Sequence, residues 1–212
     1  MICYVDIEHP SISFDPVKGS ERAQKLQGIA GRFEEIARQP CQIVHYTAFS
    51  ASQVLDQEPK AMVLSGCATF WEHYDLRTFG PLFGFLRNAA AGEMNAPAVL
   101  GTCGGHQLLA LALGVPVEHM RWVGEGEADH STREGWLLES GFQKVHLRRR
   151  DALFRGLPNT MVVLESHYDH LLRLPPGFLW LAQNQTCRVQ AMRHRTRPIY
   201  GVQWHPEVVH TE

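Results

Sequence analysis

The sequence predicts an α/β fold with a central, mostly parallel sheet and antiparallel strands added at one edge. The first half of the chain alternates short apolar runs with helical patterns, which is typical of a parallel sheet covered by helices. The second half instead holds strand-like runs separated by turn residues, which indicates antiparallel pairing. Because the 212 residues contain no internal repeat and no low-complexity linker, we expect one domain spanning residues 1–212.

Strand-forming runs and helical patterns follow one another through the first half. Ser20 is the expected N-cap, and Pro40 the stop, of a helix whose apolar residues recur at helical spacing. A later helix is apolar on every side, which predicts full burial. The predicted elements are strands at 2–7, 42–47, 61–65 and 97–102, helices at 21–37, 52–57, 77–91 and 107–113, and loops at 8–19 and 67–75.

The second half supplies one long polar segment and six strand-like runs. Residues 118–133 are polar and contain glycine, so we expect a mobile loop there. The strand-like runs lie at 136–138, 144–147, 161–164, 178–182, 189–192 and 199–204. We expect antiparallel additions at one sheet edge before the chain returns to the core.

Charge and cysteine content narrow the class of protein. The chain has 20 Lys and Arg against 22 Asp and Glu, a formal net charge of −2, so nothing global indicates a nucleic-acid or membrane partner. We interpret the run Arg148-Arg149-Arg150 as a solvated turn. Five cysteines without a C-x-x-C pair fit a reducing compartment. The sequence shows no secretory leader and no apolar run near the ~20 residues that span a bilayer, which predicts a cytoplasmic protein.

The stretch at 97–110 organises the functional prediction. It begins as a strand, turns at Cys103 between glycines and continues as a helix, which is the pattern of a nucleophile elbow. The thiolate is the reactive form of cysteine, and the positive end of a helix together with a nearby imidazole favours it. The elbow provides the helix end, so the imidazole must come from one of the 12 histidines.

His205 is the candidate base, because a carboxylate follows it at the right spacing. The run at 199–207 reads as a strand that ends in His-Pro-Glu. In extended backbone, residues two apart share a face, so Glu207 can orient the His205 ring and stabilise its cation. The sequence therefore predicts a Cys103-His205-Glu207 catalytic triad.

Acyl chemistry at a thiol also needs backbone donors for an oxyanion. The N–H of Gly104 follows the nucleophile directly at the helix start. A second donor is expected from Ser65-Gly66-Cys67, which ends the strand before the elbow strand. We predict that this segment and Gly104 form the oxyanion hole.

Four motifs together resemble the class I, triad-type glutamine amidotransferases, in particular the glutaminase domain of GMP synthases. They are L-S-G at 64–66, G-T-C-G-G-H-Q at 101–107, E-S-H-Y-D at 165–169 and G-V-Q-W-H-P-E at 201–207. The segment at 190–194 is also similar, and the resemblance covers residues 60 to 207. It implies a flavodoxin-like three-layer sandwich.

The resemblance also implies an activity: hydrolysis of the glutamine side-chain amide to glutamate and ammonia, with no cofactor. Cys103 would form a glutamyl thioester, His205 would protonate the leaving ammonia and activate water, and Glu207 would orient His205. The implied oxyanion donors are the backbone N–H groups of Cys67 and Gly104. The implied substrate-binding residues are Gly66, Gln107, Ser166 and His167.

The chain departs from the family pattern in three places. The usual Ser-Gly-Gly-Pro is here Ser65-Gly66-Cys67-Ala68, which favours a conditional oxyanion hole and brings a second thiol near Cys103, with which it could form an inhibitory disulfide. The chain ends at residue 212, where relatives usually continue into a helix, so this helix is either cut off or absent. The sequence lacks a synthetase domain and a G-x-x-x-x-G-K-[ST] loop, so the acceptor of the ammonia is expected on another polypeptide.

Three alternatives stay open from the sequence. The first is a stand-alone hydrolase of γ-glutamyl amides or peptides, whose pocket the aromatic loop at 70–74 would line. The second is a catalytically silent regulatory module on the same scaffold. The third is a metal site at His167, Asp169 and His170, for which the spacing is weak because it matches no H-E-x-x-H or paired-cysteine pattern.

Overall fold

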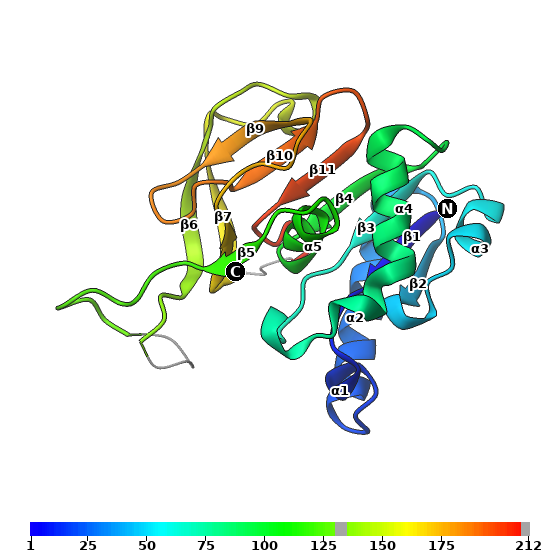
Figure 1. The fold of residues 1–212 in the computed structure, drawn as a ribbon, viewed down its shortest axis with the longest axis horizontal. Coiled ribbons are helices and arrows are strands. Elements are labelled where there is room, and N and C mark those ends of the chain that lie inside the picture. Colours follow the sequence, from blue (N-terminus) through cyan, green and yellow to red (C-terminus); the bar gives the residue numbers. More distant parts are fainter. Residues whose placement is uncertain (130–134, 209–212) are drawn as a thin grey trace.

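A nine-stranded mixed sheet forms the centre of the computed structural model, which describes residues 1–129 and 135–208 (Figure 1). In spatial order its strands are β2 (Cys41–His45), β1 (Ile2–Asp6), β3 (Ala61–Leu64), β4 (Ala98–Thr102), β11 (Ile199–Val202), β10 (Ala191–His194), β9 (Phe178–Gln183), β6 (Glu139–Leu147) and β7 (Thr160–His167). The first five strands run parallel, and the last four pair antiparallel. This confirms the predicted sheet: the antiparallel strands extend one edge, and β11 returns to the core beside β4.

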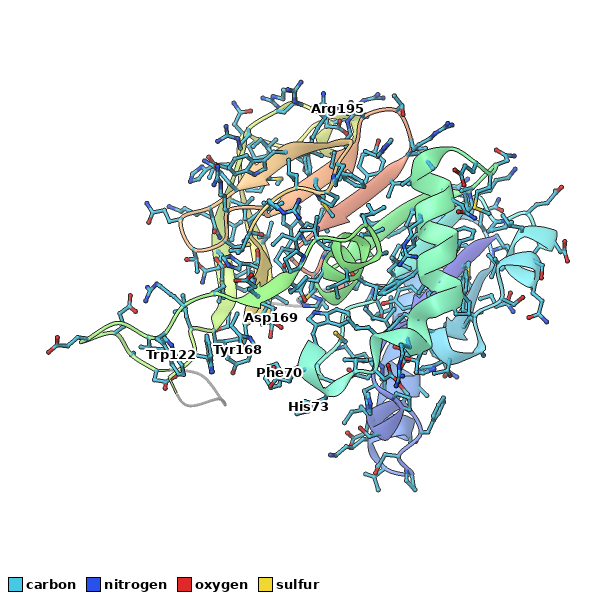
Figure 2. All side chains as sticks on the ribbon, in the orientation of Figure 1. Phe70, His73, Trp122, Tyr168, Asp169 and Arg195 are labelled. Atoms are coloured by element: carbon cyan, nitrogen blue, oxygen red, sulfur yellow. The ribbon has the colours of Figure 1, made fainter. Side chains whose placement is uncertain are left out.

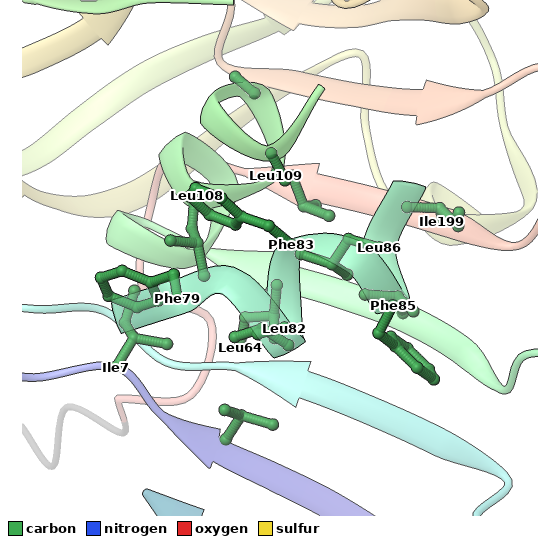
Figure 3. Close-up of a cluster of buried hydrophobic side chains, with 14 of the residues drawn as sticks. Ile7, Leu64, Phe79, Leu82, Phe83, Phe85, Leu86, Leu108, Leu109 and Ile199 are labelled. Atoms are coloured by element: carbon green, nitrogen blue, oxygen red, sulfur yellow. The ribbon is translucent and has the colours of Figure 1, made fainter. Parts of the chain in front are cut away.

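Helices cover both faces of the parallel part. Helices α3 (Ala51–Asp56), α4 (Gly80–Ala91) and α5 (Gly104–Ala112) pack on one face, and α2 (Lys18–Ala37) packs on the other (Figure 1). Figure 3 shows the main apolar cluster, in which Phe79 and Leu82 meet Leu108 of α5 above Leu64 of β3. The central strands are buried on both sides, which explains their continuous apolar sequence.

The antiparallel strands have an apolar cluster of their own. Val145 of β6, Leu181 of β9 and Trp204 pack there, with Phe154 from a short 3₁₀ turn. A separate two-stranded ribbon pairs β5 (Val117–His119) with β8 (Asp169–Leu171). This ribbon lies beside the carboxyl end of the parallel strands, and so brings chain distant in sequence to the elbow (Figure 1).

Several predicted boundaries were wrong, for local reasons. Helix α2 begins at Lys18 rather than after Ser20, and the expected loop before it contains α1 (Pro10–Ser13), which His9 caps by accepting from Ser11 N–H. The elbow helix begins at Gly104 rather than at 107, since its glycines are helical here. The last strand ends at Val202, two residues earlier than expected.

The long polar segment and the strand predicted after it also differ from expectation. Residues 117–119 form β5, and Trp136 makes a single bridge to Trp122 in place of the strand predicted at 136–138. The following strand is longer than predicted and occupies 139–147. Residues 130–133 of the predicted mobile loop lie outside the described residues. No helix within 1–129 or 135–208 is long and apolar enough to cross a membrane.

Candidate active site

The elbow places the Cys103 thiol at the carboxyl edge of the sheet. Cys103 joins β4 to α5 with φ +49° and ψ −109°, a backbone conformation that is strained for a residue with a side chain. Glycines make this sharp turn fit: a Cβ on Gly101 would lie 2.4 Å from the Gly105 carbonyl oxygen, and one on Gly105 would lie 2.3 Å from the Leu64 carbonyl oxygen. Strand and helix therefore approach each other as closely as glycine permits.

His205 and Glu207 meet this thiol from the end of β11. The His205 Nδ1 atom lies 2.8 Å from Glu207 Oε1, and the His205 N–H donates to the Leu164 carbonyl. Gly66 borders both the ring and the thiol, because a Cβ there would lie 2.9 Å from His205 Cε1 and 3.5 Å from Cys103 Cβ. The structure thus brings the three predicted catalytic side chains together at one cavity.

The charges around His205 favour its imidazolium. Burial acts to lower the pKa of His205, but the neighbouring Cys103 sulfur and the Glu207 carboxylate outweigh it and raise this pKa to about 11. A protonated ring beside a nucleophile can deliver a proton to a leaving group. The site is therefore suited to attack by the Cys103 sulfur on a carbonyl carbon, followed by proton transfer from His205.

The two predicted oxyanion donors lie against each other. A Cβ on Gly104 would stand 2.9 Å from the Cys67 backbone nitrogen and 2.6 Å from Cys67 Sγ, so the loop after β3 touches the first turn of α5. The Cys67 thiol fills this contact, and burial, together with the nearby Glu8 and Cys103, raises the pKa of Cys67 well above its usual range. The departure at position 67 is thus accommodated as a packed, neutral thiol.

Glu8 anchors this loop, and it was not among the residues predicted from the sequence. Its two carboxylate oxygens accept hydrogen bonds from the backbone N–H groups of Ala68 (2.7 Å) and Thr69 (3.2 Å). Arg22 of α2 pairs with Glu8 and Asp6 and donates to the Gly66 carbonyl. The only sequence signal for Glu8 was its position after the first strand, at the edge where the carboxyl ends of parallel strands meet.

The predicted substrate residues line one cavity of about 370 Å³ beside the thiol. The side-chain amide of Gln107 is already engaged by protein groups: it accepts from Trp71 Nε1 and donates to the Asp169 carbonyl and Gln203 Oε1. The Ser166 carbonyl oxygen lies 3.9 Å from Cys103 Sγ. Residues 66, 67, 103, 107, 166, 167 and 205 all line this cavity.

Aromatic side chains form the mouth of the cavity. The rings of Phe70 and Tyr168 make an edge-to-face contact with centroids 5.3 Å apart, and both line the cavity (Figure 2). Asp169 pairs instead with His119 of β5. Of the three residues considered as metal ligands, only His167 belongs to the group that the described residues bring together, with Glu139 and Cys187.

Comparison with known proteins agrees with this fold. The profile of the family "Glutamine amidotransferase class-I" matches residues 27–212. The chain is 38% identical over 169 residues to a subunit of the glutamine-hydrolyzing GMP synthase of Thermococcus kodakarensis, covering 76% of this chain and 72% of that protein. It is 46% identical over 121 residues to the same subunit of Pyrococcus abyssi, covering 57% and 55%. The chain therefore belongs to the class I glutamine amidotransferase family.

Solved structures show the same fold. A protein assigned as a GMP synthase subunit from Thermoplasma acidophilum superposes with a TM-score of 0.68 at 27% identity, covering all of this chain and 87% of that one. A glutamine amidotransferase from Methylobacillus flagellatus gives a TM-score of 0.68 at 20% identity, which shows likeness of fold alone. The flavodoxin-like architecture expected from the sequence is thereby confirmed.

Proposed function

We propose that this protein hydrolyses the side-chain amide of glutamine through a glutamyl thioester on Cys103. Membership of the family supports glutamine hydrolysis. The observation that carries the finer proposal is the arrangement around Gly66, where the Cys103 and His205 side chains face each other and Glu207 holds the ring.

In the proposed acylation step, Cys103 acts as a thiolate beside the His205 imidazolium. The Cys103 sulfur attacks the amide carbon, and the carbonyl oxygen becomes an oxyanion that the N–H groups of Cys67 and Gly104 stabilise. Since Nδ1 of His205 is held by Glu207, Nε2 carries the transferable proton. That proton passes to the amide nitrogen as the carbon–nitrogen bond breaks, so ammonia leaves and a thioester remains.

Deacylation returns the site to its starting state. The neutral His205 removes a proton from water, and the resulting hydroxide attacks the thioester carbon. The carbon–sulfur bond breaks, glutamate departs, and Cys103 and His205 are again an ion pair. Glutamine and water are thus converted to glutamate and ammonia without a cofactor.

We further propose that the ammonia passes to a synthetase on a separate chain. Relatives are named as a subunit of a GMP synthase, and the sequence has no G-x-x-x-x-G-K-[ST] loop.

We also propose that residues 1–212 form one domain. One continuous sheet connects the apolar clusters, so a single cooperative unfolding transition is expected.

One observation favours a second candidate, a hydrolase of γ-glutamyl amides or peptides. The aromatic contact between Phe70 and Tyr168 at the cavity mouth offers an apolar surface to a group attached to the amide nitrogen. A panel of glutamine, γ-glutamyl anilide and γ-glutamyl peptides, assayed on the protein alone, separates the two. Preference for glutamine supports the main proposal, and preference for substituted amides reverses the ranking.

The test of the main proposal compares wild type with Cys103→Ala in glutamate release. We expect Cys103→Ala to abolish it, while Cys41→Ala, a change at a partly exposed thiol away from the cavity, leaves it unchanged. Full hydrolysis by Cys103→Ala would rule out the thioester. A different result would support a silent regulatory module: wild type and Cys103→Ala both release no glutamate, and in wild type Cys103 reacts no faster than Cys41 with a glutamine-like affinity label.

A further inference from the structure

A buried cluster of charged side chains lies behind the strand end that faces the thiol. It consists of Glu139 at the start of β6, and Glu165 and His167 in β7, all three with less than a tenth of their surface exposed. The His167 Nε2 atom lies 3.0 Å from Glu139 Oε2 and 3.4 Å from Glu165 Oε2. His167 was predicted from the sequence to lie near substrate, but no partner was predicted for its ring.

The hydrogen-bond pattern fixes the protonation state of the His167 ring. Its Nδ1 atom lies 2.9 Å from the Asp169 carbonyl oxygen, which can only accept, so Nδ1 carries a proton. A neutral ring would then direct the lone pair of Nε2 at two carboxyl groups. A proton on Nε2 removes this repulsion, so the ring is an imidazolium. In agreement, Glu139 and Glu165 outweigh the effect of burial and raise the pKa of His167 to about 10.

The two carboxyl groups are not equivalent. Glu139 accepts hydrogen bonds from the side-chain amides of Asn184 and Gln190, which hold its carboxyl group in place. Glu165 lies farther from the ring and, within the described part of the chain, accepts no hydrogen bond from another amide. Burial raises the pKa of Glu165 in spite of the nearby imidazolium. Glu139 is therefore the nearer and more firmly held partner of the His167 ring.

We propose that Glu139 is a positioning residue, which holds His167 as a cation and thereby fixes the strand end that faces the Cys103 thiol. The Ser166 carbonyl oxygen, one residue before the ring, is 3.9 Å from Cys103 Sγ. The Asp169 carbonyl accepts from both the His167 ring and Gln107 Nε2, so the cluster also holds a predicted substrate residue. The kinetic part of this inference rests on the proposed glutamine hydrolysis.

Matched isosteric substitutions test the inference. Glu139→Gln keeps the shape of the side chain but removes its carboxylate. The strand end that carries Ser166 and His167 is then held less firmly, while the Cys103-His205-Glu207 triad stays in place. We expect the KM for glutamine to rise about 10-fold or more, with kcat within about threefold of wild type, because a buried hydrogen bond to a charged group is worth roughly one to two powers of ten. Glu165→Gln changes the more distant carboxyl group, which no other side-chain amide among the described residues holds, so we expect a clearly smaller rise in KM than for Glu139→Gln. Equal effects of the two substitutions, or none from Glu139→Gln, would overturn the proposal.

A second readout does not depend on activity. In ¹⁵N spectra of the histidine rings, His167, identified by its loss in His167→Gln, is expected to carry protons on both nitrogens at about pH 7. Glu139→Gln is expected to remove the Nε2 proton, and Glu165→Gln to retain it. A neutral His167 in wild type contradicts the inference. An inactive protein with this doubly protonated ring refutes the proposed function and leaves the state of the cluster established.

Metal analysis separates a proton from a bound cation. Ligand atoms of Glu139, His167 and Cys187 lie within 4.8 Å of one another, a set that suits zinc. Cys103, His106 and His170 are further titratable groups that interact with the ring. We expect the purified protein to hold no stoichiometric metal after growth with added zinc. Stoichiometric zinc that is lost in Glu139→Gln would show that a metal ion, and not a proton, joins these residues.

Discussion

Replacing Gly66 with alanine puts a methyl group against the ring of His205. The new Cβ would stand 2.9 Å from His205 Cε1, and ordinary contacts begin at 3.4 Å, so the ring must move by about 0.5 Å. A misplacement of ~1 Å in a reacting group costs on the order of 100-fold in rate. Half that displacement corresponds to about 10-fold in kcat/KM, or ~1.4 kcal/mol of transition-state stabilisation.

The assay measures glutamate release, with the rate of affinity labelling of Cys103 as a readout for protein without its partner. The free energy of unfolding in urea shows whether the variant folds normally. Gly28→Ala in α2 is the matched control, since a Cβ there meets nothing within 4 Å. That control is expected to keep full activity and to gain about 0.5–1 kcal/mol in stability. Full kcat/KM in a folded Gly66→Ala protein would show that Cys103 and His205 do not work as a pair across this glycine.

Three further predictions concern the same site. Gly104→Ala inserts a Cβ 2.9 Å from the Cys67 nitrogen, so the oxyanion donors separate and kcat falls about 100-fold in the glutamate-release assay, whereas retained kcat would remove Cys67 and Gly104 as the donors. Glu207→Gln weakens a charged hydrogen bond worth ~1.5–3 kcal/mol, so kcat falls about 10- to 100-fold, and unchanged kcat would show that the carboxylate does not orient the ring. The raised pKa values of His205 (about 11) and His167 (about 10) add stability that is fully present below about pH 6.5 and is lost as the pH rises through these values. The free energy of unfolding in urea should therefore fall from about pH 7 to 10. His167→Gln should make this fall smaller, and an unchanged pH dependence in that variant would contradict the prediction.

The sequence predicts the features that local geometry encodes. Alternating apolar runs and helical spacing gave the order of the elements, and the glycines around Cys103 gave the elbow, because backbone that tight needs residues without a side chain. The contact between His205 and Glu207 was predicted for extended chain, but both residues lie beyond the end of β11 and the contact is made across a turn at Pro206-Glu207. These predictions depend on neighbours in sequence.

The sequence does not reveal contacts between distant segments. Glu8 anchors a loop about 60 residues away, and Glu139 pairs with a histidine 28 residues later in the neighbouring strand. Neither residue lies in a motif, so only the register of the sheet shows what each carboxylate reaches. The start of α2 was misplaced because Ser20 has the right chemistry for a cap, but the Asp15 carboxylate already accepts from the backbone N–H groups of Val17 and Lys18.

Trapping the acyl intermediate tests the central claim most directly. The protein is mixed with glutamine, quenched in acid within a turnover and digested, and the peptide that contains Cys103 is weighed by mass spectrometry. The mechanism predicts one added glutamyl group on Cys103, released by mild base and stabilised in a His205→Asn variant, which deacylates slowly. A glutamyl group on Cys67, or hydrolysis that proceeds with Cys103 unmodified at every time point, would contradict the assignment of Cys103 as the nucleophile.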